Sequence, residues 1–181
     1  MMLETDRLVL RPFLGKDRSP FAAINGDSEV MRYFPSPLTR AESDDFIRHI
    51  EARRKETGFG FLAVERKHDR RLIGLCGLSK PGFKAHFTPC IEIGWRLELA
   101  AWGQGFAYEA ARSVLADAFA PGNVDEIVAF TARGNQSSRR LMERLGMRRD
   151  PDDDFDHPSL PPDSGLNPCV LYRLNSKEFR A

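Results

Sequence analysis

A predicted strand, a short loop with two glycines and a long helix follow one another in residues 91–119, and this order constrains the fold more than any other feature. Residues 91–97 are rich in β-branched and apolar side chains, as strands are. The helix is predicted because apolar residues recur at helical spacing and share one face, namely Ala107, Ala110, Ala111, Val114, Leu115, Ala118 and Phe119. Such a segment favours a mixed α/β fold.

The rest of the chain supplies further strands and helices for this fold. A helix is predicted where Ser19, as N-cap, precedes Pro20, and a longer one where a capping box at Thr39 opens a stretch that Gly58 ends. Another helix is expected over residues 137–145. Apolar runs predict strands at residues 8–10, 59–65, 72–78, 127–131 and 170–174, with a turn at residues 121–123.

These elements together predict the architecture. We expect an α/β (α+β) fold in which a strongly twisted, mostly antiparallel sheet of about six or seven strands carries helices on both faces. Residues 150–168 are rich in proline and aspartate and are expected to form a loop. Because the sequence shows neither an internal repeat nor a long linker, residues 1–181 are expected to form a single domain.

Charge and cysteine content argue against several classes of protein. The 27 basic and 26 acidic residues nearly cancel, so no overall field draws the chain to nucleic acid or to an anionic membrane. Its three cysteines are an odd number without a CxxC pair, which argues against a disulfide framework or a zinc site. No uncharged apolar run approaches the ~18 residues of a membrane span. We therefore expect a soluble, cytoplasmic protein.

The loop between the strand and the long helix suits a diphosphate. Helix N-termini leave up to four N–H groups unpaired and carry partial positive charge. Gly103 and Gly105 would let phosphate oxygens approach the backbone. A dinucleotide fingerprint needs a third glycine where Tyr108 stands, and a P-loop needs a lysine where Phe106 stands, so the segment matches neither. Two glycines alone are more typical of an ordinary turn packed against a helix.

Three segments resemble a known family. Residues 102–107 read Trp-Gly-Gln-Gly-Phe-Ala and resemble motif A, Gln/Arg-x-x-Gly-x-Gly/Ala, of the GNAT (GCN5-related N-acetyltransferase) superfamily. Trp102 departs from the usual Gln or Arg, but the string is similar to the branch that acetylates ribosomal-protein N-termini. Residues 135–147 resemble motif B, which is Asn-x-x-Ser, a helix, then Gly and an apolar residue. With an opening strand at residues 5–11, the likeness covers residues 5–174.

This resemblance implies acetyl-coenzyme A (acetyl-CoA) as cosubstrate and no metal. Backbone amides from Gln104 to Ala107 would hold the pyrophosphate, and the strand at Arg96 and Leu97 would pair with the pantetheine arm. An amide near Trp95 or Arg96 would meet the reacting carbonyl oxygen where this strand splays from the next. The expected coenzyme-binding residues are Arg96, Leu97, Trp102, Gly103, Gln104, Gly105, Phe106, Ala107, Asn135, Ser138 and Arg139.

Glu92 is the candidate general base. Acyl transfer to an amine needs the amine uncharged, and a carboxylate in a partly dry cleft can take its proton. Glu92 lies in an apolar strand, where a charge is costly unless one face opens onto a site, and the superfamily often places its base on this strand. Alternation equally allows Glu92 to be a solvated charge opposite Ile91 and Ile93.

Ser138 is the candidate to position or protonate the leaving sulfur. The resembling branch has a serine three residues after the motif B asparagine, here Asn135. Asn135 or Ser137 could instead simply cap the helix, and both roles can coexist. Cys76 and Cys90 lie without a local Cys-His motif, so direct transfer is expected rather than an acyl-cysteine.

An acidic loop is expected on the acceptor side. Residues 152–158 read Asp-Asp-Asp-Phe-Asp-His-Pro, and a similar Phe-Asp-His-Pro element occurs in some members of the resembling branch. The spacing fits no calcium loop, which needs a glycine and a distal glutamate. Asp154, Asp156 and His157 are expected to form a lip that attracts a cationic amine, although a solvated acidic loop has the same composition.

The expected activity is that of an acetyl-CoA-dependent N-acetyltransferase. Its acceptor would be an amine-bearing small molecule or a protein N-terminus, and the protein would act as a monomer or homodimer, without nucleic-acid or membrane partners. Three alternatives stay open: another acyl donor, an amino-sugar or antibiotic acceptor, and a catalytically idle CoA-binding or partner-binding module. The last remains because a fold does not guarantee its chemistry.

Overall fold

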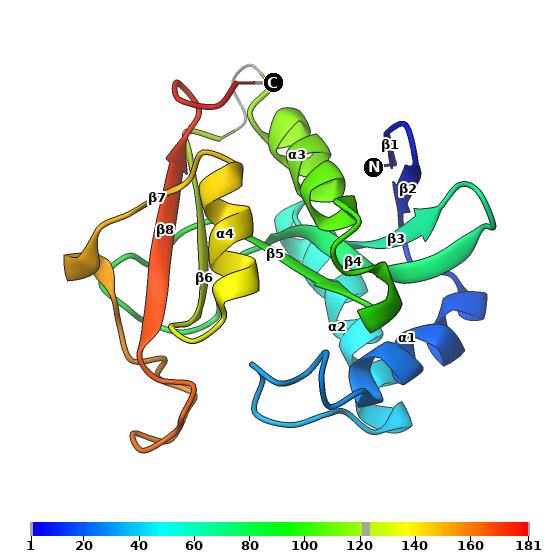
Figure 1. Cartoon of the computed structure of the whole chain (residues 1–181), viewed down its shortest axis with the longest axis horizontal. Helices are drawn as coiled ribbons and strands as arrows, with labels where there is room; N and C mark the ends of the chain where they lie inside the picture. Colours follow the sequence, from blue (N-terminus) through cyan, green and yellow to red (C-terminus); the bar gives the residue numbers. More distant parts are fainter. Residues whose placement is uncertain (1, 121–123, 181) are drawn as a thin grey trace.

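In the computed structural model, which describes residues 2–120 and 124–180, eight strands form one sheet with helices on both faces (Figure 1). The strands are β1 (Leu3–Glu4), β2 (Leu8–Arg11), β3 (Phe61–Arg66), β4 (Arg71–Ser79), β5 (Glu92–Leu97), β6 (Glu126–Ala132), β7 (Arg148–Arg149) and β8 (Cys169–Asn175). The α-helices are α1 (Arg18–Gly26), α2 (Arg40–Thr57), α3 (Phe106–Ala118) and α4 (Gln136–Arg144), and short 3-10 helices span Gly15–Asp17, Leu99–Ala101 and Pro151–Asp153. The expected α/β class is confirmed, and the turn expected at residues 121–123 lies outside the described residues.

The sheet is mostly antiparallel. Its order is β1-β2-β3-β4-β5-β6-β8-β7, and within the described residues only the central strands β5 and β6 run parallel. The expectation of six or seven strands is too low, because β1 and β7 have two residues each and carry no alternating apolar pattern. Both exist because they pair with a longer neighbour, β2 or β8.

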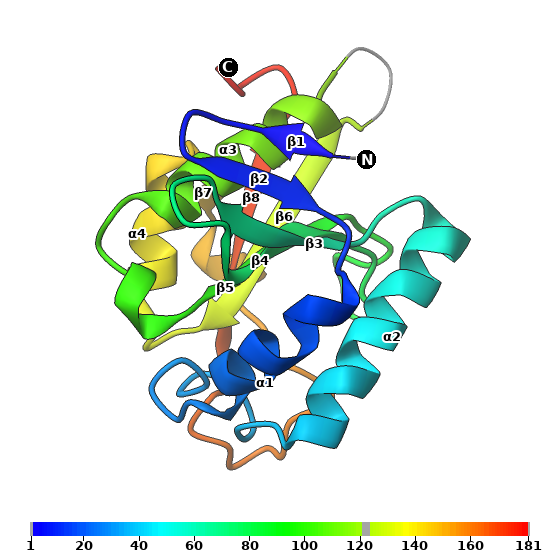
Figure 2. The same cartoon turned by 90° about the vertical axis from the view of Figure 1, so that its right-hand side faces the viewer.

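Two pairs of helices cover opposite faces of the sheet, as Figures 1 and 2 show. Ile93 and Leu97 of β5 share a buried cluster with the apolar faces of α3 and α4. Leu75 of β4 belongs to a second cluster with residues of α1 and α2. Since side chains alternate along a strand, Glu92 and Arg96 of β5 face α1 and α2. The two faces of β5 therefore have different neighbours.

Loops, rather than helices, cover one face of β6 and β8. An aromatic cluster, defined here as Phe83, Phe87, Phe130 and Phe155, packs there with Val128 and Leu171. The Phe87 and Phe155 rings lie 4.7 Å apart and the Phe83 and Phe130 rings 5.7 Å apart. These rings join the β4–β5 loop to the loop before β8.

The helix ends follow the sequence signals with one exception. Thr39 and Glu42 form the expected capping box at α2, and Gly58 ends that helix with a φ of 78°. The exception is α1, which begins at Arg18 after a short 3-10 turn, so the expected N-cap Ser19 lies inside the helix. Among the described helices, none is long and apolar enough to cross a membrane.

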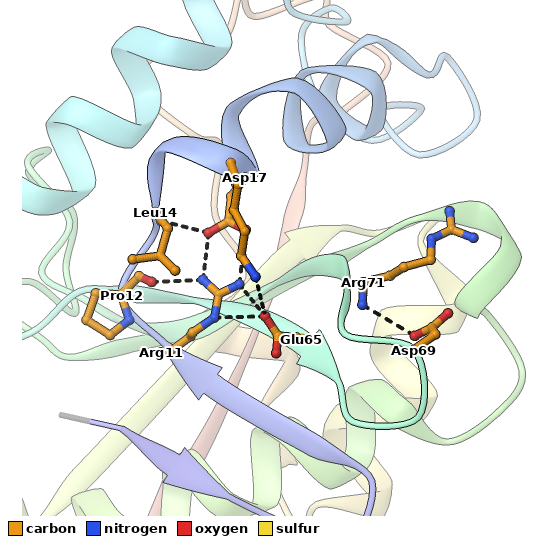
Figure 3. A network of polar contacts seen from close by, with 8 residues as sticks. Arg11, Pro12, Leu14, Asp17, Glu65, Asp69 and Arg71 are labelled. Atoms are coloured by element: carbon orange, nitrogen blue, oxygen red, sulfur yellow. Dashed lines mark hydrogen bonds and ion pairs between the residues drawn. The ribbon is translucent and has the colours of Figure 1, made fainter.

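A buried ionic network explains where α1 begins. Figure 3 shows the Arg11 guanidinium between Asp17 and Glu65, with Nη1 2.6 Å from Asp17 Oδ2 and Nη2 2.5 Å from Glu65 Oε2. The hydrogen bond to Asp17 raises the pKa of Arg11 above its ordinary value. Burial raises the pKa of Glu65, but bonds from Arg11 and Lys16 outweigh it and lower the net value. The network fixes β2, β3 and the turn before α1.

Replacing Arg11 by methionine is expected to destabilise the protein by about 3–5 kcal/mol, because Asp17 would stay buried without a counter-charge and Glu65 would keep only the solvent-exposed Lys16. Urea unfolding measures the change. Arg32→Met is the matched control, since its ion pair with Glu29 is solvent-exposed and contributes little to stability. Equal losses in the two variants would contradict a structural role for the network.

Candidate active site

The parallel strands β5 and β6 separate soon after they meet, which leaves one edge of β5 open (Figure 1). In the described part of the chain their register holds a single pair, Glu92 with Val128. The Val128 N–H donates to the Ile91 carbonyl at 2.9 Å at that point. Beyond it, backbone groups of β5 lack a strand partner on the β6 side and can meet a ligand.

The phase of the β5 backbone decides which amide faces this opening. Successive residues direct their backbone groups to opposite edges of a strand. The Ile91 carbonyl faces β6, whereas the Glu98 N–H donates to the Ile73 carbonyl of β4 at 2.8 Å. Odd-numbered residues of β5 therefore face β6. Of the two amides expected from the sequence, that of Trp95 faces the opening and that of Arg96 faces β4.

The glycine loop ends in an exposed helix N-terminus. Gly103 and Gly105 have φ angles of 72° and 79°, which favour glycine. Gly105 is the N-cap of α3, and no side chain of the described residues caps it, whereas Thr39 and Asn135 cap α2 and α4. The first amides of α3 thus remain available to an anionic ligand.

Arg7 braces the glycine loop from the first strands of the chain. Its Nη1 donates to the Gln104 carbonyl at 3.0 Å, its Nε donates to Glu109 Oε2 at 2.6 Å, and its guanidinium lies 4.4 Å from the centre of the Phe106 ring. Burial raises the pKa of Glu109, but bonds from Thr5 and Arg7 outweigh it. Sequence reasoning missed Arg7 because its partners lie about a hundred residues away, and its place in the family's opening strand was the available signal.

Trp102 closes the end of β5. Its Nε1 donates to the Leu97 carbonyl at 2.9 Å, while 43% of the residue stays exposed. Since Leu97 is odd-numbered, its carbonyl faces the open edge, and the indole already uses it. Any ligand that pairs with this edge therefore meets the groups around Trp95 rather than the Leu97 carbonyl. Gln104 stiffens the same loop by donating to the Ala100 carbonyl at 2.6 Å.

Glu92 occupies an enclosed position at the start of β5. The Ser79 hydroxyl donates to its Oε2 at 3.1 Å. Burial raises the pKa of Glu92 to about 7, although the Ser79 bond lowers it. The residue is partly buried rather than part of a solvated strand face. A carboxyl group with this pKa can accept a proton at neutral pH.

Ser138 lies across the opening from β5, in the first turn of α4. Trp95 Nε1 lies 3.4 Å and Asn135 Nδ2 3.1 Å from Ser138 Oγ, and both donate to it. Asn135 also caps α4, because its Oδ1 accepts from the Ser138 N–H at 3.3 Å. Capping and positioning thus coexist. Because the hydroxyl oxygen accepts both bonds, its proton is free for a third partner.

The arginines at the start of α4 differ in their surroundings. Arg139 donates to the Tyr172 hydroxyl at 3.3 Å and to the Arg133 carbonyl at 3.1 Å. Arg140 is exposed to solvent. The contact with Tyr172 holds α4 against β8. The structure therefore adds no support for a coenzyme contact by Arg139.

Arginines pair with two of the four aspartates of the acidic loop, Asp153 and Asp154. Asp154 accepts from Arg149 at 2.9 Å and from Arg133 at 3.2 Å, and the Arg149 bond lowers its pKa. Asp153 is engaged by Arg173 at 2.7 Å. The His157 ring lies 4.5 Å from Phe83, and burial lowers its pKa. Asp154 and His157 thus hold the loop in place, whereas Asp156 is exposed.

The thiols are unsuited to carry an acyl group at neutral pH. Burial raises the pKa of Cys76 to about 12, and that of Cys90 and Cys169 to about 11. A thiol with such a pKa is almost entirely protonated, and the thiolate is the nucleophile. Among the described residues, no group of three or more His, Cys, Asp or Glu side chains could hold a metal ion.

The amino-acid sequence is similar to those of acetyltransferases. The family model described as "Acetyltransferase (GNAT) domain" matches residues 7–148. The uncharacterized N-acetyltransferase YnaD of Bacillus subtilis (strain 168) is 29% identical over 151 residues, which are 83% of this chain and 84% of YnaD. The uncharacterized protein YkkB of the same strain is 27% identical over 146 residues, 80% of this chain and 84% of YkkB.

Solved structures share the fold over nearly the whole chain. A GNAT-family acetyltransferase from Bacillus anthracis superposes with a TM-score of 0.80 at 25% identity, over 98% of this chain and all of that one. RimL, a ribosomal L7/L12 α-N-protein acetyltransferase in complex with coenzyme A, gives a TM-score of 0.78 at 11% identity, over 97% and 98% of the chains. The likeness to RimL is one of fold.

The bond from Ser79 to Glu92 sets a measurable pKa. Ser79→Ala is expected to raise the pKa of Glu92 above about 7, because the bond that favours the charged carboxylate is lost while burial remains. A ¹³C NMR titration of the Glu92 carboxyl carbon measures the change. Ser113→Ala is the control, since that hydroxyl donates to the Ala110 carbonyl. An unchanged or lower pKa in Ser79→Ala would refute this account.

Proposed function

Because the chain belongs to the GNAT acetyltransferase family, we propose that it transfers an acetyl group from acetyl-CoA to a primary amine by direct transfer. The observation that carries the proposal is the N-terminus of α3, which no described side chain caps and which follows the open edge of β5 by one short loop. An uncapped helix end suits a diphosphate, and an open strand edge suits an amide-bearing arm. Relatives such as YnaD are named N-acetyltransferases, and this name supports an amine acceptor.

The residues beside the loop fit the coenzyme. The first amides of α3, at Phe106 and Ala107, together with the glycine backbone at Gly103 and Gly105, would bind the pyrophosphate. Arg7 adds positive charge beside them. The backbone around Trp95 would bind the pantetheine arm. When bound, acetyl-CoA supplies the activated acetyl group.

The chain's own groups can then carry the proton transfers. Glu92, directly or through water, takes a proton from the amine, whose nitrogen forms the C–N bond as the C–S bond breaks. The backbone N–H of Trp95 would stabilise the negative charge that develops on the carbonyl oxygen. The Ser138 hydroxyl would donate a hydrogen bond to the leaving sulfur and so stabilise the thiolate as the C–S bond breaks. The raised thiol pKa values support a path without an acyl-cysteine.

On the acceptor side, we propose that residues 152–158 form an acidic lip in which Asp156 supplies the charge. Asp154 and His157 would act by shaping the loop, because arginines hold the first and aromatic packing holds the second. Asp156 would supply the charge that attracts a cationic amine. Figures 1 and 2 both place this loop at the same end of the molecule as the loop before α2.

Acetyl-CoA at about 100 times its Kd is expected to stabilise the protein by about 2.7 kcal/mol, a rise in Tm of several degrees. Gly105→Ala should lose most of this rise, because a methyl group would stand at the phosphate. Gly58→Ala is the matched control, since Gly58 has almost the same φ, 78° against 79°, far from the loop. Both variants should lose similar intrinsic stability, about 1–2 kcal/mol. An equal acetyl-CoA response in both would remove the loop from the coenzyme site.

Glu92→Gln is expected to lower kcat about 10²–10⁴-fold while leaving acetyl-CoA affinity nearly unchanged. The wild-type rate should rise with pH through an apparent pKa of about 7, as the Glu92 carboxylate loses its proton, and the variant should lack this rise. Ser138→Ala should also lower kcat, with the exposed neighbour Ser137→Ala as control. Steady-state release of free thiol with a panel of amines provides the readout. Full activity in Glu92→Gln would exclude it as the base, and binding without turnover in the wild type would indicate an idle module.

A further inference from the structure

Arg96 holds an unusual position on the face of β5 that it shares with Glu92. Its guanidinium carbon lies 4.1 Å from the centre of the Phe34 ring and 5.4 Å from that of Phe46. Its Nη1 donates to Asn25 Oδ1 of α1 at 2.6 Å. The charge is therefore enclosed by two aromatic rings and an amide, on the side of the sheet away from α3.

No carboxylate of the described residues neutralises this charge. Arg96 Nε is buried and lacks a hydrogen-bond partner among them. Burial lowers the pKa of Arg96 to about 10, without a compensating contribution from an acidic neighbour. Aromatic faces recover part of the cost of a buried cation, but buried charges in proteins are ordinarily paired. The other enclosed guanidinium, that of Arg11, holds Asp17 and Glu65.

The free edge of Arg96 has the geometry that binds carboxylates elsewhere in this protein. Arg66, Arg149 and Arg173 each donate from Nε and Nη2 to one aspartate, so this edge forms a two-pronged bond. In Arg96, Nη1 donates to Asn25, the buried Nε lacks a partner, and no side-chain hydrogen bond of the described residues involves Nη2. A planar anion matches that edge.

The position of Arg96 assigns such an anion to the acceptor rather than to the coenzyme. Arg96 and Glu92 lie four residues apart on one strand face, about 13 Å between Cα atoms, and the long arginine side chain shortens the gap. The glycine loop leads into α3 on the opposite face. Phe34 belongs to the loop before α2, and its neighbour Tyr33 donates to the Gly134 carbonyl at 3.1 Å, across the β5–β6 opening.

We propose that Arg96 binds a carboxylate of the amine acceptor through its Nε and Nη2 edge, so that the preferred acceptors are amino acids, which carry both an amine and a carboxylate, rather than amines without a carboxylate. This inference rests on the proposed acetyltransferase function, with Glu92 at the amine end. The acceptor is then held at both ends, by its amine near Glu92 and by its anion at Arg96. Phe34 and Phe46 fix the plane of the guanidinium.

The test uses straight-chain ω-amino acids of three to eight carbons, each paired with its primary amide, as acceptors. The pair differs in charge and hardly in size. Wild-type protein should acetylate the best carboxylate with a kcat/KM at least about ten-fold above that of its amide. Arg96→Met should bring the ratio close to one without changing the KM for acetyl-CoA. Arg96→Lys, which keeps the charge but not the fork, should retain part of the preference.

Arg48→Met is the control, because it removes a positive charge from the exposed side of α2 and should leave the ratio intact. Titration calorimetry of the same pairs with the protein saturated with coenzyme A gives a second readout that needs no turnover. If neither compound of any pair is acetylated but the carboxylates still bind more tightly through Arg96, the proposed activity fails and the anion site stands. The assignment is overturned if the acid and the amide of every pair have equal kcat/KM and equal affinity, or if neither binds. It is also overturned if the preference for the acid survives in Arg96→Met.

Discussion

The interrupted pairing between β5 and β6 is the constraint on which the candidate site depends. Two parallel strands that stayed paired would bury the backbone of β5 completely. Here one pair, Glu92 with Val128, joins them in the described chain, and the strands then diverge. The divergence exposes the Trp95 amide, gives Trp102 a carbonyl to bind, and leaves room for Ser138 to face β5 from α4. A break in the sheet thus creates a surface that an intact sheet lacks.

The two faces of β5 present different groups of the candidate site. On one face, Trp95 joins the motif B serine and the helices that carry the glycine loop. On the other, Glu92 and Arg96 meet α1, α2 and the loop between them. Alternation along a single strand would therefore separate the proposed coenzyme side from the proposed acceptor side.

Local signals predicted most of the fold. The capping box at Thr39, the apolar face of α3 and the strand runs have their causes within a few neighbouring residues, so the sequence shows them directly. The short β1 and β7 depend on partner strands, and the start of α1 depends on Arg11 and Glu65, which are distant in sequence. The candidate site divides in the same way. The glycine loop and Asn135 were visible as motifs, but the brace by Arg7 and the unpaired edge of Arg96 arise from tertiary contacts.

The aromatic cluster has a consequence for how such a protein can diversify. It lies on the face of β6 and β8 that helices leave uncovered, and it joins the β4–β5 loop to the loop before β8, where Phe155 forms a single backbone bridge with Cys169. Ring contacts tolerate many substitutions that keep their volume, so these loops can change length and sequence while the strands beneath stay in register. Selection for a new acceptor can therefore act on this half of the molecule independently of the half that would hold the coenzyme. Homologous proteins could therefore keep the same proposed coenzyme-binding half and differ in the amines that they accept.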